Sequence, residues 1–274
     1  MMKLNRRLFA FLSLGAFALL SACSEQRHVE KSFRKILREP WQMVVDDSLT
    51  HYDSGKWHLD GLRGRISCDS LGLTLRAGEV IDCDSDHVVL WNRTRVSGPV
   101  RVEYDFTRLD TSRVNSVNII YLLAQGSGEG EYRSDIMSWN ELRTVPAMKV
   151  YFNHMRSYHI SYAVTDRNSD GTLGDYIRGR QYDPAAGRGL KGTELMPEYK
   201  DTHLFKPGIT YHMTFIVYGG RCYMEVCGDG RRALFWFRID TSKALHEGYV
   251  GLRQMWGRTS RYAGFKVWTL DEVQ

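Results

Sequence analysis

Short runs that alternate apolar and polar side chains recur from Trp41 almost to the end of the chain, and this period of two constrains the fold more than any other feature. Turn strings such as Asp53-Ser54-Gly55 and Gly228-Asp229-Gly230 separate many of the runs. The 15 Tyr, 11 Phe and 7 Trp also favour strands. Since no strand–helix–strand alternation and no second long helix is visible, the pattern predicts an all-β sandwich or jelly roll. The expected strands are residues 41–45, 87–91, 100–106, 117–123, 148–153, 158–164, 176–182, 211–218, 222–226, 233–237, 249–255 and 262–270.

The first 22 residues have the pattern of an export signal. A basic start is followed by an apolar run, residues 8–20, that is short for a membrane span. The string Leu20-Ser21-Ala22-Cys23 resembles a bacterial lipobox, in which the signal is removed just before a cysteine that receives a diacylglycerol. We therefore expect a signal peptide over 1–22 and a lipid on Cys23, with an ordinary signal peptide as the alternative. The expected location is the bacterial cell envelope, either periplasmic or on the outer-membrane surface.

The mature chain has two predicted parts. Residues 23–40 form a tether with one short amphipathic helix, because Val29, Phe33 and Ile36 have helical spacing and Pro40 stops a helix. Residues 41–274 form the β-sandwich domain. Removing the three basic residues of the signal lowers the basic count from 37 to 34 against 32 acidic residues, so the net charge falls from +5 to +2. This balance argues against nucleic acid as a partner, and we expect membrane contact through the Cys23 lipid only.

Four cysteines remain after Cys23, in a compartment where disulfides can form. Cys222 and Cys227 are five positions apart in one expected strand, so they point to opposite faces and cannot pair. Cys68 and Cys83 flank a strand-turn-strand pattern, and their pairing stays open. The absence of a Cys-x-x-Cys motif argues against a structural zinc site.

The region 148–182 collects residue types that suit a binding or catalytic site. Strand alternation assigns one set to the core: Val150, Phe152, Tyr158, Ile160, Tyr162, Val164 and Ile177. If the three expected strands are neighbours, the opposite face gathers Tyr151, Asn153, His159, Ser161, Tyr176, Arg178 and Arg180. Two arginines beside a histidine and tyrosines form a surface that suits a carboxylate or a sulfate. The alternative is a solvated sheet face with ordinary cross-strand pairs.

Four strings carry information beyond their local pattern: Trp57-His58-Leu59-Asp60-Gly61, His87–Trp91, Tyr158-His159-Ile160-Ser161-Tyr162-Ala163 and Asp175-Tyr176-Ile177-Arg178-Gly179-Arg180. In this order they resemble a bacterial family of unknown function with a concanavalin A-like, galectin-type jelly roll. The resemblance spans about Trp41 to Leu270. It implies that fold and a role in the use of plant or host glycans, and it assigns no catalytic residues.

Two functions on carbohydrate fit these residues equally well. In a polysaccharide lyase, Arg178 and Arg180 would neutralise a uronate carboxylate, His159 would remove the proton, and Tyr176 or Tyr151 would protonate the leaving oxygen. In a non-catalytic glycan-binding lipoprotein, the same face would bind without cleavage, and tryptophans would stack on sugar rings. The expected binding residues are Tyr151, Asn153, Ser161, Trp91 and Trp139, with Trp256 as a further stacking candidate.

Two further patterns are weighed and set lower. Glu103-Tyr104-Asp105 begins the Glu-x-Asp-x-x-Glu motif of sandwich glycoside hydrolases, but Arg108 replaces the last acid, so an exposed strand face is preferred. Asp166, Asn168 and Asp170 resemble half a calcium loop that Ile177 fails to close, so a hairpin tip is preferred and calcium stays the alternative. No other cofactor is expected. The long irregular stretches 124–145 and 183–206 are expected to be binding or lid loops, or else disordered.

Overall fold

The computed structural model describes residues 24–187 and 189–270, so the predicted signal peptide and Cys23 lie outside the described residues. The chain divides into two compact units, Met1–Pro40 and Trp41–Gln274. In the first unit a helix covers residues 24–36, which confirms the predicted short helix before Pro40. The second unit carries the strands and the candidate site.

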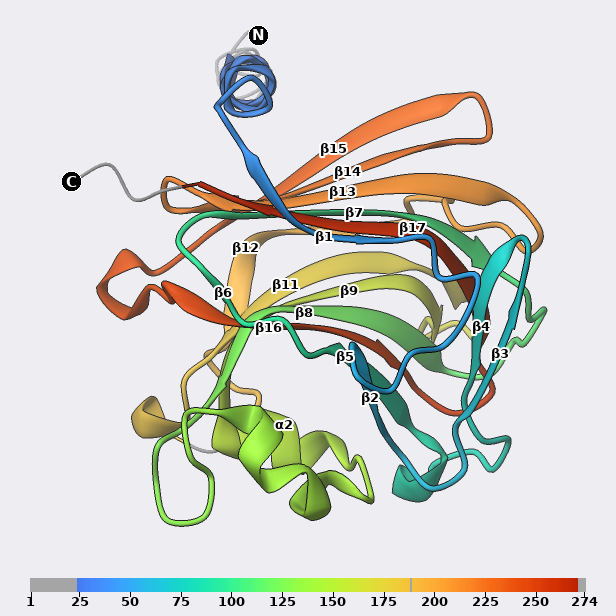
Figure 1. Ribbon diagram of the computed structural model, residues 1–274. Helices are drawn as coiled ribbons and strands as arrows, with labels where there is room; N and C mark the ends of the chain where they lie inside the picture. The colour runs from blue at the N-terminus through green and yellow to red at the C-terminus, as the bar shows by residue number, and fades with distance from the viewer. Residues whose placement is uncertain (1–23, 188, 271–274) are drawn as a thin grey trace, which may run out of the picture. The chain divides into compact units, whose positions relative to one another are not determined.

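Two antiparallel sheets face each other in the second unit, as the all-β prediction requires (Figure 1). Sheet A has the order β15 (Arg231–Arg238), β14 (Arg221–Gly228), β13 (Thr210–Tyr218), β7 (Val100–Arg108), β17 (Thr259–Thr269), β4 (Gly72–Arg76) and β3 (Arg65–Asp69), and β1 (Gln42–Asp47) also pairs with β17. Sheet B has the order β12 (Glu194–Lys200), β11 (Tyr176–Tyr182), β9 (Met155–Arg167), β8 (Ser116–Gly126), β16 (Glu247–Gln254), β5 (Val88–Asn92) and β2 (Trp57–Asp60), with β10 (Leu173–Gly174) on β9 and β6 (Val96–Ser97) on β16. The helical elements are η1 (Asp84–Asp86), η2 (Ile136–Arg143), α2 (Met148–His154), η3 (Pro184–Ala186) and η4 (Thr241–Lys243).

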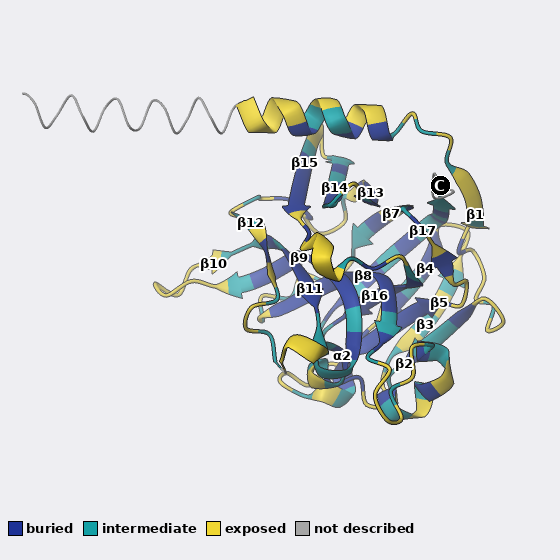
Figure 2. Ribbon diagram, turned by 90° about the vertical axis from the view of Figure 1, so that its left-hand side faces the viewer, coloured by how far each residue is buried: buried dark blue, intermediate teal, exposed yellow. Residues whose placement is uncertain are grey.

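The main core lies between the sheets and follows from strand alternation. In β7, Tyr104 and Phe106 are buried there, whereas Glu103 and Asp105 point to the outer face of sheet A. The strands of sheet B are mostly buried on both faces (Figure 2). Exposed residues lie instead in neighbouring turns, for example at the β10 hairpin. A strand that is buried on both faces needs a second cover besides sheet A.

That cover is the stretch of residues 127–154, here called the covering segment, which contains η2 and α2 and lies on the side of sheet B away from sheet A (Figure 1). It closes a second apolar core against the outer face of sheet B. The residues buried in this second core are Val89, Trp91, Val117, Ile119, Tyr121, Ala124, Ile136, Trp139, Tyr151, Met155, Val164, Tyr182 and Tyr249. Sheet B is therefore the middle of three layers.

The strand predicted at residues 148–153 is wrong, because these residues form α2. The run was interpreted with a period of two, yet Met148, Tyr151 and Phe152 also have helical spacing. A helix presents Tyr151, fully buried, and the partly buried Met148 and Phe152 to the second core. The apolar outer face of sheet B therefore favours the helix over the strand. The local sequence of residues 148–153 does not show that this face needs a cover.

The face assignments in β9 and β11 are confirmed with one exception. Tyr158, Ile160, Tyr162 and Ile177 lie in the main core as predicted, but Val164 lies in the second core. Between Tyr162 and Thr165 the pairing with β8 shifts register, and Ala163 has a φ of 48°, which marks a β-bulge. A bulge inserts one residue and reverses the alternation beyond it.

Several short strands escaped prediction. They are β2, β3, β4, β6, β10 and β12. The stretch 183–206 was expected to be an irregular loop, but it contains η3 and the edge strand β12, which pairs with β11. Its register with β11 shifts between Ile177 and Gly179, so the sequence of β12 shows no regular alternation.

Candidate functional site

The register of sheet B places polar side chains in two adjacent rows on its outer face. In order from β11 to β2, the first row contains Arg178, Ser161, Ile119, Arg253, Val89 and Asp60. The second row contains Arg180, His159, Tyr121, Gly251, Trp91 and His58. Corresponding members are two residues apart on each strand, so both rows point to the same face. We call these twelve residues the polar strip.

Three aromatic rings stack at the centre of the polar strip. The Trp91 and Tyr121 rings are 5.5 Å apart and 14° from parallel, and they flank Gly251, which has no side chain to separate them. Tyr151 of the covering segment lies parallel to Tyr121, with centroids 5.7 Å apart. The stack therefore joins β5, β8 and α2, and it explains why a glycine stands between two large rings.

Asp60 joins the covering segment to sheet B. Its Oδ2 accepts hydrogen bonds from Trp91 Nε1 at 2.7 Å, Arg143 Nε at 2.7 Å and Tyr151 OH at 2.9 Å. Its Oδ1 lies 3.2 Å from His58 Nε2. Arg143 is fully buried, so this ion pair neutralises a charge that has no access to water. Sequence reasoning gave no site role to Asp60 or Arg143, although Asp60 stands in the Trp57–Gly61 string that carries the family resemblance.

His159 is buried under the covering segment. Its Nδ1 contacts the Tyr182 hydroxyl, and its Nε2 lies 2.7 Å from Ser161 Oγ. Burial, with a further contribution from Arg180 and Arg253, holds the pKa of His159 well below its usual range. The imidazole is therefore neutral at physiological pH, which suits a proton acceptor or a hydrogen-bonding group.

The two predicted arginines are not free cations. Arg180 Nη1 lies 2.9 Å from Glu194 Oε1 and also donates to Thr193 Oγ1 and to the Leu190 carbonyl. Arg178 forms an ion pair with Glu198, and its guanidinium lies 4.1 Å from the centre of the Tyr176 ring. Both glutamates come from β12, the strand that escaped prediction. The cross-strand ion pairs expected as the alternative for this face are therefore present at both arginines, and the role of Arg178 and Arg180 in recognising a carboxylate or a sulfate stays a prediction.

The remaining predicted residues fall into two groups. Ser161 and Trp91 lie in the polar strip with His159, and Tyr151 lies over it. Asn153 accepts a hydrogen bond from the Gly189 backbone amide, and Trp139 donates to the Arg133 carbonyl and carries the Arg143 guanidinium 4.5 Å above its ring. These two therefore support the covering segment. Trp256 stacks on His87 at 4.7 Å.

An open depression of about 340 Å³ lies beside the β11 end of the polar strip. Its lining includes Gln181, Lys191, Thr193, Glu194 and Lys243. Glu194 belongs both to this depression and to the Arg180 ion pair. The depression thus offers a solvent-accessible polar surface next to the buried part of the strip.

The two patterns set lower in the sequence have structural roles. Asp170 accepts from the backbone amide and hydroxyl of Thr172, and Asn168 donates to the same hydroxyl, as expected of a hairpin tip. Among residues 24–187 and 189–270, no cluster of three His, Cys, Asp or Glu side chains is suited to a metal ion. Glu103 and Asp105 lie on the outer face of sheet A, where Asp105 Oδ1 is 2.8 Å from His212 Nδ1.

Cys68 and Cys83 are both free thiols in the structure. Cys222, buried in the main core, and Cys227, half-buried, are also free, as the prediction that they cannot pair within one strand requires. In the part of the chain that is described, no helix combines the length and the apolar character that a membrane crossing needs.

Known proteins resemble this chain in fold. No family model and no curated sequence matches it. Among solved structures it is similar to a Bacillus subtilis protein of unknown function with a galectin-like fold, at 20% identity and a TM-score of 0.60 over 83% of this chain and 97% of that one. It is also similar to basic winged bean lectin solved with the Tn-antigen, at 11% identity and a TM-score of 0.52 over 83% and 98%. A further similar structure is the exoplasmic/lumenal domain of VIP36 solved with Ca²⁺ and Man3GlcNAc. Its sequence identity is 12% and its TM-score is 0.50, over 80% of this chain and 87% of that one.

These likenesses show a galectin-like jelly roll, as the resemblance found in the sequence implied. The two facing antiparallel sheets described above are the two layers of that fold.

Proposed function

We propose that this protein is a carbohydrate-binding protein of the bacterial cell envelope, and that it binds its ligand on the outer face of sheet B. The observation that supports this most directly is the polar strip, which combines stacked aromatic rings with buried donors and acceptors. Sugars present apolar ring faces together with hydroxyl groups, so such a combination suits them. Jelly rolls of this kind include a lectin solved with the Tn-antigen and a lumenal domain solved with Man3GlcNAc.

The β11 end of the polar strip is the part that a ligand would meet first. Tyr176 and Arg178 are half-buried there, and Glu198 is half-buried beside them. The ion pair of Arg178 with Glu198 leaves donors and acceptors in contact with water, which a sugar hydroxyl can replace. His159 and Ser161 lie next to them on sheet B, where both are buried under the covering segment.

Anchoring through a lipid on Cys23 is the second part of the proposal. It is supported by the Leu20-Ser21-Ala22-Cys23 string and by the basic and apolar residues before it. The helix over residues 24–36 then follows directly after the anchored residue.

The test is binding of neutral and acidic oligosaccharides to the mature chain from Ser24 onward, measured by calorimetry and by thermal shift. We expect Tyr176→Ala to weaken binding about tenfold or more, since an aromatic face contributes roughly 1.5 kcal/mol. His212→Ala, on the outer face of sheet A, is the matched control and should leave binding unchanged. If His212→Ala weakens binding and Tyr176→Ala does not, the ligand binds sheet A, which would contradict the proposal.

A lyase acting on acidic sugars is the second candidate. It is favoured by the neutral, buried His159 in contact with the Tyr182 hydroxyl, since elimination needs a base and a proton donor near a cation. In this version Tyr182 replaces Tyr176 and Tyr151 as the proton donor, because it is the tyrosine that touches His159. Release of unsaturated uronate product by wild type, abolished in His159→Ala, would support the lyase. Binding without any such product would leave the protein a binder.

A further inference from the structure

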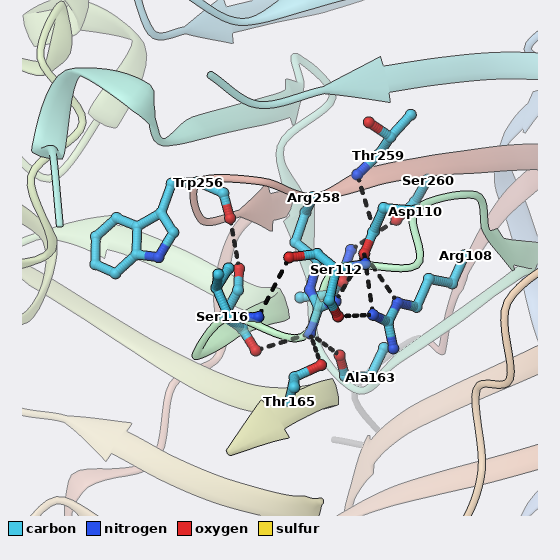
Figure 3. A network of polar contacts seen from close by, with 12 residues as sticks. Arg108, Asp110, Ser112, Ser116, Ala163, Thr165, Trp256, Arg258, Thr259 and Ser260 are labelled. Carbon is cyan, nitrogen blue, oxygen red and sulfur yellow. Dashed lines mark hydrogen bonds and ion pairs between the residues drawn. The ribbon is translucent and has the colours of Figure 1, made fainter. Parts of the chain in front are cut away.

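Three arginines are fully buried in the described residues, and they differ in how their charge is balanced. Arg143 is paired with Asp60. Arg258 donates to Asp110 Oδ1 at 3.0 Å and to the oxygens of Ser116, Ala163 and Thr165 (Figure 3). Arg253 has no Asp or Glu partner within residues 24–187 and 189–270. Among these three arginines it is therefore the one without a direct ion pair in the described residues.

The hydrogen bonds of Arg253 are incomplete as well. Nη2 donates to the Pro146 carbonyl at 2.6 Å and to His87 Nδ1 at 2.7 Å. Nε and Nη1 are buried and have no acceptor in hydrogen-bond geometry, and the Tyr121 hydroxyl is the nearest polar group that interacts with the guanidinium. A guanidinium carries five N–H donors, so three of them are unused. The guanidinium also lies 4.6 Å from the centre of the Tyr151 ring, whose face stabilises a cation only weakly.

The groups in direct contact with Arg253 are neutral at physiological pH, and the carboxylates of Asp84 and Asp60 approach it only through His87 and Tyr151. Burial lowers the pKa of His87 to about 3 and holds that of His159 well below its usual value. Burial raises the pKa of the Tyr121, Tyr151 and Tyr182 hydroxyls. None of these groups supplies a negative charge, and a cation buried without a counter-charge destabilises the fold. Such a cost is retained at places where a protein binds something that removes it.

We infer that Arg253 receives an anionic group of the glycan, either the carboxylate of a uronic acid or a sulfate ester. The inference rests on the proposed function, because Arg253 lies in the first row of the polar strip, between Ile119 and Val89. An anion would accept from Nε or Nη1 and would neutralise the guanidinium. The guanidinium is fully covered, so Pro146 and Tyr151 of the covering segment must move away when the ligand enters.

The binding experiment uses oligosaccharides in three matched forms. One form carries free uronate carboxylates, the second is carboxyl-reduced and neutral, and the third is the neutral form after sulfation. We expect wild type to prefer an anionic form, and the preferred form identifies carboxylate or sulfate as the anion. Arg253→Met should lower the affinity for the preferred anionic form roughly 10- to 100-fold. The affinity for the neutral form should stay unchanged. Arg101→Met, on the outer face of sheet A, is the control.

The outcomes separate this inference from the proposed function. Equal affinity for neutral and anionic forms, or anion binding that survives Arg253→Met, overturns the role of Arg253 and leaves carbohydrate binding in place. Absence of binding to every form counts against the proposed function. In that event the stability of the ligand-free protein decides the role of Arg253.

Thermal unfolding without ligand is that second measurement. In Arg253→Met, the neutral His87 imidazole can carry its single proton on Nδ1 and donate it to the Pro146 carbonyl, which lies 3.3 Å away. We therefore expect the Tm to stay the same or rise. Arg258→Met removes the donor to the Ser116 and Ala163 carbonyls and to the Thr165 hydroxyl, and it removes one of the two arginines paired with Asp110, so its Tm should fall by about 5 °C or more. A similar fall in both variants would make Arg253 a structural residue and the inference wrong.

Discussion

At the scale of single residues, Gly251 is the smallest member of the polar strip and holds its two largest rings in place. A Cβ at this position would lie 2.5 Å from the Trp91 ring. Trp91 is fully buried and stacked on Tyr121, so it has no room to withdraw. The absence of a side chain here is therefore a packing requirement.

We predict that Gly251→Ala destabilises the protein by about 1–3 kcal/mol through overpacking. Urea unfolding followed by tryptophan fluorescence would measure the change. Gly55→Ala is the control, because a Cβ there meets the flexible Asp53 carboxylate at 3.0 Å. Equal effects in the two variants would contradict the packing argument.

His212 on sheet A gives a prediction for pH. The contact with Glu103, together with the hydrogen bond to Asp105, raises the pKa of His212 to about 9 from 6.5. A raised pKa in the folded state means that the protonated form stabilises the fold. We expect this contribution to be complete below pH 6.5 and to disappear as the pH rises through about 9.

The measurement is the free energy of unfolding on both sides of that window. His212 is half-exposed, so solvent screening keeps the effect small. His212→Gln should remove the part of the pH dependence that lies in the window. A profile that His212→Gln leaves unchanged would show that other groups produce it.

At the scale of elements, the covering segment depends on Asp60. Asp60 binds Arg143 and Tyr151, and both belong to this segment. We predict that Asp60→Asn destabilises the protein by about 3 kcal/mol, since it leaves Arg143 buried without a counter-charge. Hydrogen exchange should increase first in η2 and α2.

Asp69→Asn is the matched control for that variant. Asp69 forms an ion pair with Arg261 at 3.2 Å, but its side chain is exposed. Such surface pairs contribute at most about 1 kcal/mol. A loss of stability in Asp69→Asn as large as in Asp60→Asn would argue against a special role for the buried pair.

The sequence correctly predicts the strands that have a clear alternation of apolar and polar residues. The prediction fails where packing against another part of the fold determines the secondary structure. Residues 176–182 form β11 within the predicted bounds, and Ile177 faces the core as expected. Residues 148–153 form a helix because the outer face of sheet B needs a cover, which no local pattern reveals.

The candidate site shows the same division. Alternation alone brings His159, Ser161, Arg178 and Arg180 to one face, and the register confirms that grouping. The glutamates that neutralise the two arginines come from β12, and Arg253 comes from a run that was assigned simply to a strand. Which charges neutralise one another depends on which strands become neighbours. Predicting the ion pairs therefore requires the strand pairing as well as the local sequence pattern.

At the scale of the whole molecule, the expected anchor is Cys23. We predict that Cys23→Ser moves the protein from the detergent phase to the aqueous phase in a phase-separation experiment, because the acyl chains are then missing. Cys83→Ser, at a half-buried free thiol, is the control and should stay in the detergent phase. Retention of the Cys23→Ser protein in the detergent phase would contradict the lipid anchor.

The rows of the polar strip run across the strands of sheet B rather than along them. From β2 to β11 they cross six strands, and neighbouring strands are about 4.8 Å apart, so the strip is roughly 24 Å long. A single sugar would fill only a small part of that length. Under the proposed function, a chain of several sugars laid perpendicular to the strands could follow this strip only where the covering segment has moved off the outer face of sheet B, with its charged group near Arg253.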